Sequence, residues 1–296
     1  MKKSNKIILT VIIILLMAML VISGITLWNR HQQSKPVTAD VSWYDESGEE
    51  FIITTVEQLY GFAQLSENYD FNNQTVKLGT DIVVNRGDAE DWRSNVPGRR
   101  WTPITGFFGT FDGQGYTISG IYGDSVVTSL GLFTDTKADC VIKDLKLVNS
   151  YFKNNTDKGT GSIIGIGGGT LESIYSDAII SSAGRYVGGL IGRVTEKGQN
   201  LISNCWFDGT ITMNGADTYD VGGLVGAFNV SDAINTVEHC HSTADIACKG
   251  DRNGGIFGNV GNGSFVNLTD SMFNDSVVRI KVALKNMRSY RTLICR

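Results

Sequence analysis

The chain has 296 residues, a formal net charge of −4 and only three histidines. This acidic balance argues against a nucleic-acid partner, because nucleic acids select a basic surface. So few histidines leave little room for zinc sites or histidine-based catalysis. Glycine is abundant (35 residues) and proline rare (3), with 42% hydrophobic residues, which indicates an ordered protein rich in turns.

The first 30 residues predict a membrane segment. Lys2, Lys3 and Lys6 precede an apolar run from Ile7 to Trp28. This run is longer than the apolar region of about 7–15 residues in a cleaved signal peptide, and it is long enough to span a bilayer. We expect residues 1–30 to form one transmembrane helix, an uncleaved signal-anchor with the rest of the chain extracytoplasmic. Secretion after cleavage is the alternative.

Residues 31–49 are expected to be a linker, and residues 50–105 an N-terminal cap with the first strands and a polar loop. Two overlapping capping boxes predict the start of a helix: Thr54 with Glu57, and Thr55 with Gln58. Apolar residues then recur at helical spacing on one face: Val56, Leu59, Tyr60 and Ala63. Such a helix would cover the open end of a stack of strands.

A hexapeptide with glycine at its second and third positions occurs three times: VGGLIG at 187–192, VGGLVG at 221–226 and NGGIFG at 253–258. The spacings are 34 and 32 residues. A nearly fixed period of this size predicts stacked supersecondary units. We expect the glycines to adopt positive φ at sharp bends and to leave room for neighbouring coils.

The segments downstream of the three copies, together with three earlier and less similar segments, align as three apolar columns. The first column holds Ile118, Ile142, Leu171, Ile202, Val237 and Leu268. The second holds Ile121, Leu145, Ile174, Cys205, Cys240 and Ser271. The third holds Tyr151, Ile180, Ile211, Ile246 and Val277. Short apolar runs bounded by Gly, Asn, Asp and Ser are typical of strands and turns, so residues 106–277 are predicted to form an all-β solenoid.

The three hexapeptides resemble the GLUG repeat of bacterial cell-surface proteins. Trp101 to Ile121 resembles the first coil of such proteins, and Phe51 to Val84 resembles their N-terminal cap. The resemblance implies a right-handed parallel β-helix and an adhesin-like role, with a host or neighbouring-cell surface glycan or protein as partner. Some relatives carry an immunoglobulin-cleaving zinc peptidase, but this chain has no H-E-x-x-H motif.

Two surfaces are candidates for ligand binding. The polar loop places Trp92 and Arg93 close to Trp101, which suits sugar or peptide contact; a solvated insertion is the alternative. If Arg193 faces solvent, strict alternation predicts an exposed apolar stripe on the solenoid: Phe108, Phe133, Ile164, Ile191, Val225 and Phe257. The alternative is that alternation fails at a bend and the stripe is buried.

Cys205 and Cys240 share a column, and an interior ladder of free thiols is favoured over a disulfide. His239 and His241 point outward, with Asp270 beside His239 on the next coil. Without a third firm ligand we predict neither a metal nor a cofactor.

Three functions remain open. The first is non-catalytic adhesion or ligand display by a membrane-anchored solenoid. The second is a polysaccharide lyase or glycoside hydrolase, which needs paired carboxylates; four strand aspartates do not clearly share a column: Asp144, Asp177, Asp208 and Asp245. The third is a non-catalytic fragment of a larger surface peptidase. The basic tail, residues 278–296, fits either a capping helix or a truncated reading frame.

Overall fold

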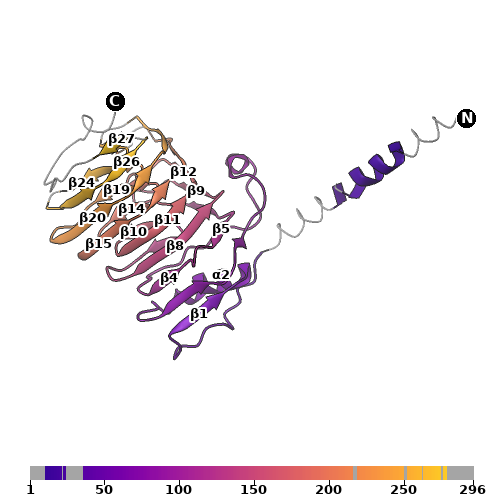
Figure 1. Cartoon of the computed structure of the whole chain (residues 1–296), viewed down its shortest axis with the longest axis horizontal. Coiled ribbons are helices and arrows are strands. Elements are labelled where there is room, and N and C mark those ends of the chain that lie inside the picture. Colours follow the sequence, from indigo (N-terminus) through magenta and orange to yellow (C-terminus); the bar gives the residue numbers. More distant parts are fainter. Residues whose placement is uncertain are drawn as a thin grey trace, which may run out of the picture.

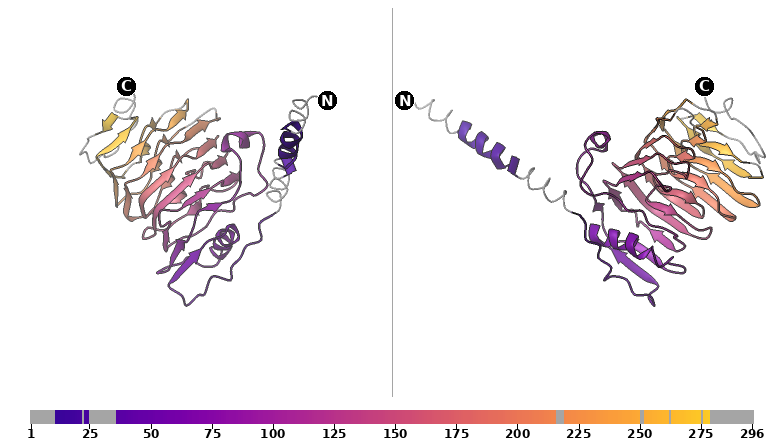
Figure 2. Two further views of the ribbon diagram at one scale, coloured as in Figure 1. Left: turned by 45° about the vertical axis from the view of Figure 1, so that its right-hand side comes forward. Right: turned by 180° about the vertical axis from the view of Figure 1, so that it is seen from behind.

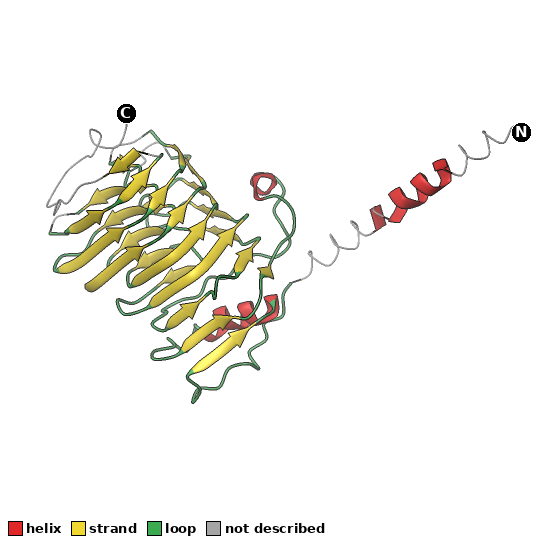
Figure 3. Ribbon diagram, viewed as in Figure 1, coloured by secondary structure: helices red, strands yellow, loops and turns green. Residues whose placement is uncertain are grey.

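The computed structural model describes residues 11–21, 23–24, 36–215, 219–249, 252–261, 263–274 and 276–278. In this part of the chain, parallel strands wind into an all-β solenoid of about six turns. Strands of successive turns lie side by side along the solenoid axis (Figures 1 and 3). The expected parallel β-solenoid is therefore confirmed.

Four sheets form the faces of the solenoid within the described residues. The largest contains β1 (Glu50–Ile53), β2 (Thr75–Leu78), β3 (Ile82–Val83), β4 (Thr110–Asp112), β5 (Thr117–Ser119), β8 (Val141–Val148), β11 (Thr170–Ser176), β15 (Gly198–Ser203), β16 (Trp206–Phe207), β20 (Ala233–Glu238), β21 (His241–Ser242), β25 (Val266–Thr269), β26 (Ser271–Phe273) and β27 (Ser276–Val278). The second contains β7 (Phe133–Asp135), β10 (Ile164–Gly167), β14 (Ile191–Val194), β19 (Val225–Phe228) and β24 (Phe257–Val260). The third contains β6 (Tyr122–Ser125), β9 (Tyr151–Asn154), β12 (Ile179–Ser182), β17 (Thr210–Met213) and β22 (Asp245–Ala247). The smallest contains β13 (Val187–Gly188), β18 (Val221–Gly222) and β23 (Asn253–Gly254).

The strand register confirms most of the first two columns. The first runs through Ile142, Leu171, Ile202, Val237 and Leu268. The second runs through Leu145, Ile174, Cys205, Cys240 and Ser271. All of these side chains are buried, so each coil packs its apolar residues on those of the coils beside it.

The two expected heads of these columns, Ile118 and Ile121, lie elsewhere. Phe111 pairs with Ile142 and begins the first column, whereas Ile118 pairs with Leu147. The backbone N–H of Ile121 donates to the hydroxyl of Ser150. The reason is that β4 and β5 are two short strands that both pair with the long β8. An alignment by sequence similarity skipped the first of them.

The third column begins one residue later than expected. Phe152, not Tyr151, pairs with Ile180. Because side chains alternate between the two sides of a strand, this shift turns Tyr151 away from the interior. Its ring instead stacks on Tyr122, with the centroids 5.8 Å apart. Val277 is not a member, since it lies in β27, which pairs antiparallel with β26.

Helix α2 (Val56–Leu65) covers the N-terminal end of the solenoid (Figure 2). The hydroxyl of its N-cap, Thr55, accepts a hydrogen bond from the N–H of Gln58 at 3.2 Å, as one of the expected capping boxes requires. The Gln58 side chain reaches back to the N–H of Thr54, at 2.8 Å. The ring of Phe62 anchors the helix on four phenylalanines of the first coils: Phe71, Phe107, Phe111 and Phe133.

The glycine-rich hexapeptides stack in register, with Gly188 beside Gly222 and Gly222 beside Gly254. Their glycines do not have the positive φ that we expected. The residues with positive φ directly precede each copy instead: Tyr186, Asp220 and Arg252. The second expected role is confirmed, because a Cβ at Gly223 would overlap the backbone carbonyl of Gly255 on the neighbouring coil.

Residues 11–21 and 23–24 are helical, and the large apolar side chains among them are exposed. Within the described residues, no helix has both the length and the apolar character that a membrane span requires. The rest of the expected transmembrane segment (1–10, 22 and 25–30) and the tail from residue 279 lie outside the described residues.

Candidate functional site

Five of the six residues of the apolar stripe expected on the outside of the solenoid lie in its interior. The sixth, Phe108, is partly exposed and lies outside this column, where its N–H donates to the carbonyl of Asp70 at 2.8 Å. Phe133 and Val225 are 0% exposed, and Ile191 and Phe257 are 2% exposed. Their strands do pair in register, so they form one column as expected. This column faces the core, and the expectation of an exposed binding stripe is wrong.

The regular alternation of inward-facing and outward-facing side chains fails at the bend that leads into these strands. The N–H groups of Leu190 and Ile191 both donate to the carbonyl of Leu224, at 2.9 and 3.0 Å. On the next coil, the N–H groups of Leu224 and Val225 both donate to the carbonyl of Ile256, at 2.8 and 3.0 Å. Since two consecutive residues share one acceptor, the backbone departs from the regular ladder and both side chains enter the core.

The two tryptophans proposed for ligand contact are also buried. Trp92 lies in the 3-10 helix η1 (Ala89–Arg93), is 4% exposed and packs edge-on against a tyrosine of β6. Trp101 is 5% exposed, and its Nε1 donates to a backbone carbonyl of the core at 3.2 Å. Arg93 is exposed and pairs with Glu90 at 3.4 Å. Of the three, only Arg93 offers its polar group to solvent, and a ligand for this loop stays a prediction.

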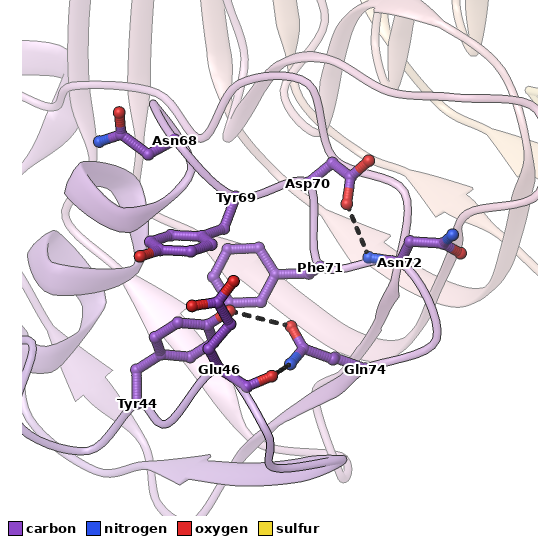
Figure 4. Close-up of a pocket in the computed structure, with 8 residues that line it drawn as sticks. All are labelled: Tyr44, Glu46, Asn68, Tyr69, Asp70, Phe71, Asn72 and Gln74. Atoms are coloured by element: carbon purple, nitrogen blue, oxygen red, sulfur yellow. Dashed lines mark hydrogen bonds between the residues drawn. The ribbon is translucent and has the colours of Figure 1, made fainter.

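A pocket of about 390 Å³ lies beside helix α2 (Figure 4). Two segments meet in it: residues 44–46, from the stretch expected to be a linker, and residues 68–74, between α2 and β2. We term it the cap pocket. Its lining residues are Tyr44, Glu46, Asn68, Tyr69, Asp70, Phe71, Asn72 and Gln74.

Part of the expected linker is folded against the cap, and this creates the pocket. The N–H of Asp40 donates to the carbonyl of Glu57 in α2 at 2.9 Å. The ring of Trp43 packs edge-on against Phe62, with centroids 6.2 Å apart. These contacts hold the segment on the helix and place Tyr44 against the loop that follows it.

Three aromatic rings form the wall of the cap pocket. The ring centroid of Tyr44 lies 5.1 Å from that of Tyr69 and 5.2 Å from that of Phe71. Phe71 is buried, whereas the two tyrosines are partly exposed. Figure 4 shows the tyrosine rings with Phe71 behind them. The pocket therefore offers two accessible tyrosine rings on a buried aromatic support.

Gln74 fixes the floor of the pocket. Its Nε2 donates to the backbone carbonyls of Glu46, at 3.2 Å, and Gly48, at 2.8 Å. Its Oε1 accepts a hydrogen bond from the hydroxyl of Tyr44 at 3.3 Å. The amide thus ties the two segments together, and its polar atoms are already used within the protein.

Four other polar side chains of the lining are exposed: Glu46, Asn68, Asp70 and Asn72. The lining holds two carboxylates and no basic residue. Burial raises the pKa of Tyr44, and the negative charge of Glu46 adds to this rise. The Tyr44 phenol therefore stays protonated at neutral pH. The geometry suits a polar ring-shaped ligand, neutral or positively charged.

Asp177 and Asp208 occupy one column on neighbouring coils. The N–H of Asp208 donates to the carbonyl of Ser176 at 2.9 Å, which sets the two aspartates side by side. This corrects the sequence alignment, which found no clear column among the strand aspartates. Burial raises the pKa of Asp177, with repulsion from Asp208 adding to the rise. A hydrogen bond of 2.6 Å from the N–H of Asn149 opposes it.

A row of aromatic rings runs beside this column on the outer face. Tyr175, Trp206 and His241 come from consecutive coils, with centroid distances of 5.9 and 4.9 Å. Trp206 is 42% exposed. As expected, His239 lies beside Asp270, with Nε2 and Oδ2 4.0 Å apart. No three candidate metal ligands converge anywhere in the described part of the chain.

Cys205 and Cys240 are adjacent, buried and free, as the ladder interpretation predicts. The thiol of Cys240 donates to the carbonyl of Ile202 at 3.3 Å. These cysteines therefore contribute to the core of the solenoid and not to a site.

The chain matches no model of a protein family. Over 170 residues, 56% of this chain, it is 30% identical to halomucin from Haloquadratum walsbyi, and the match spans only 2% of halomucin. Among solved structures, a protein described as a putative immunoglobulin A1 protease from Bacteroides ovatus aligns over 83% of each chain, with 16% identity and a TM-score of 0.47.

Proposed function

We propose that this chain is a membrane-anchored, extracytoplasmic β-solenoid of the GLUG-repeat type that binds a glycan of a host or neighbouring cell without catalysis. The cap pocket carries this proposal. Its two partly exposed tyrosine rings supply apolar faces for a sugar ring, and its exposed amides and carboxylates supply partners for sugar hydroxyls. The N-terminal lysines and the apolar run after them support the anchoring.

Replacing Tyr69 with alanine is expected to weaken glycan binding about tenfold, because the pocket loses one of its two partly exposed tyrosine rings. The measurement is a glycan array with the full-length protein, followed by calorimetric titration of the best oligosaccharide. Tyr116→Ala is the matched control, since Tyr116 is also exposed but lies in the turn between β4 and β5. If the wild-type protein binds no glycan, or if both variants lose affinity equally, the proposal fails.

The column of Asp177 and Asp208 favours a second candidate function, a glycoside hydrolase. Such enzymes pair a protonated carboxylic acid with an ionised carboxylate across the bond that breaks. The raised pKa of Asp177 suits the acid, and Asp208 on the next coil suits the carboxylate. The exposed ring of Trp206 offers a contact for the sugar beside them.

In a hydrolase of this kind, Asp177→Asn is expected to lower the rate of bond cleavage roughly a hundredfold, since asparagine supplies no acidic proton. The wild-type rate should fall as the pH rises through the raised pKa of Asp177, because the general acid is then ionised. Release of reducing ends from pectin-like and host glycans measures this. Asp245→Asn, on another face, is the control. If the wild-type protein releases no reducing ends, this candidate is excluded.

A further inference from the structure

We infer that the cap pocket selects a sugar that carries a free, protonated amine. This inference rests on the proposed function, because it names the class of sugar that the pocket binds. Three observations carry it: the charge of the pocket segments, the position of Glu46 beside the aromatic rings of the lining, and the hydrogen bonds that the other polar groups make.

The two segments that form the pocket carry only acidic charge. Together with the residues that flank them, these segments (44–49 and 67–74) contain no lysine or arginine. Their acidic residues are Asp45, Glu46, Glu49, Glu67 and Asp70. The neighbouring Lys77 is engaged by Glu50, with Nζ and Oε2 2.7 Å apart. Such a site attracts an ammonium group and repels the carboxylate or sulfate of an acidic sugar.

Glu46 is the carboxylate best placed to receive the amine. It lines the pocket together with the rings of Tyr44 and Tyr69 (Figure 4), and it is close enough to Tyr44 for its negative charge to raise the pKa of that phenol. These rings are only 5.1 Å apart between centroids. An ammonium group beside the Glu46 carboxylate is therefore within reach of two tyrosine rings, and a cation is attracted to the face of an aromatic ring. An N-acetyl group in the same place is uncharged, so it gains neither the attraction of the carboxylate nor that of the aromatic rings.

The remaining polar groups suit the sugar hydroxyls. The Oδ1 atom of Asp70 accepts the backbone N–H of Asn72 at 3.0 Å, so this carboxylate helps to hold its own loop. The side-chain amides of Asn68 and Asn72 are exposed at the rim of the pocket and offer both donors and acceptors. Glu46 is therefore the lining residue that determines which charge on the ligand the pocket prefers.

The test compares two oligosaccharides of equal length, a glucosamine oligomer and its N-acetylated form, titrated into the full-length protein at a pH where the free amine is protonated. Acetylation keeps the ring and its other hydroxyls and removes the charge. We expect the amine form to bind at least tenfold more tightly, and this preference to decrease at high salt. Glu46→Gln should abolish the preference while it leaves the affinity for the acetylated form unchanged.

The control variant is Glu49→Gln, which removes a charge from the same segment but not from the lining, and it should keep most of the preference. Glu46→Gln preserves the local fold because Gln74 bonds the backbone carbonyl of Glu46 and not its side chain. Equal affinity for the two oligomers overturns the inference and leaves the proposed function intact. Binding of neither overturns the inference, and the glycan array then decides whether the proposed function holds. A preference that survives in Glu46→Gln overturns the assignment of the amine to Glu46.

Discussion

Gly223→Ala is expected to lower the free energy of unfolding by about 3 kcal/mol. A Cβ at this position would overlap the carbonyl oxygen of Gly255 on the next coil and the hydroxyl of Ser242. The coils cannot separate easily, because the N–H of Gly223 donates to the carbonyl of Gly254 at 3.1 Å. Urea denaturation followed by circular dichroism measures the change.

Gly123→Ala is the matched control for this effect. The atoms nearest to a Cβ there are the ends of two side chains, Leu130 Cδ1 at 3.0 Å and Phe152 Cδ1 at 3.1 Å. Side-chain ends shift more easily than backbone, so we expect a loss within about 1 kcal/mol. Equal losses in the two variants would contradict the close approach of coils at the hexapeptide.

Asp220→Asn is expected to lower the free energy of unfolding by about 2 kcal/mol, because it removes the buried carboxylate that pairs with two partly exposed arginines. Burial raises the pKa of Asp220, so the desolvation of its carboxylate offsets part of the stabilisation. The Asp220 side chain is fully buried and bonds the guanidinium groups of Arg185 and Arg252, each at 2.9 Å. These arginines come from the coils on either side of Asp220. Asparagine tolerates the positive φ of 63° at this position, so the variant isolates the loss of charge.

The control for Asp220 is an exposed ion pair. Glu90 and Arg93 lie 3.4 Å apart on the surface, and Glu90→Gln should change the free energy of unfolding by less than about 1 kcal/mol. Thermal and urea denaturation of both variants at two salt concentrations provide the measurement. If Asp220→Asn lowers the free energy of unfolding no more than Glu90→Gln does, the ion pairs of Asp220 do not hold the coils together.

The repeat in the sequence was sufficient to predict the stacking of coils. Similar residues recur where strands of successive coils pair, as Leu171 and Ile202 do. It was insufficient in the first coil, where Phe111 and not Ile118 pairs with Ile142. There two short strands face one long strand, and sequence similarity does not reveal which of them begins the column.

The cap pocket was missed because its two halves are distant in sequence. Tyr44 stands in a polar stretch that resembles a linker, and Tyr69 follows the capping helix. Helix α2 brings them together, through contacts such as that between Trp43 and Phe62. The adjacent aromatic residues Trp43 and Tyr44 in an otherwise polar segment were the one local signal that this segment is folded.

Apolar spacing and glycine recurrence are local properties of the chain, so they are enough to predict a stack of parallel coils with a helical cap. Which side chains reach solvent depends on contacts between coils, which the folded structure shows. At Leu190 and Ile191, a carbonyl of the next coil accepts two consecutive N–H groups and ends the alternation. Five of the six residues of the expected outer stripe are buried as a result, and the accessible aromatic rings lie in the cap pocket, where two distant segments meet.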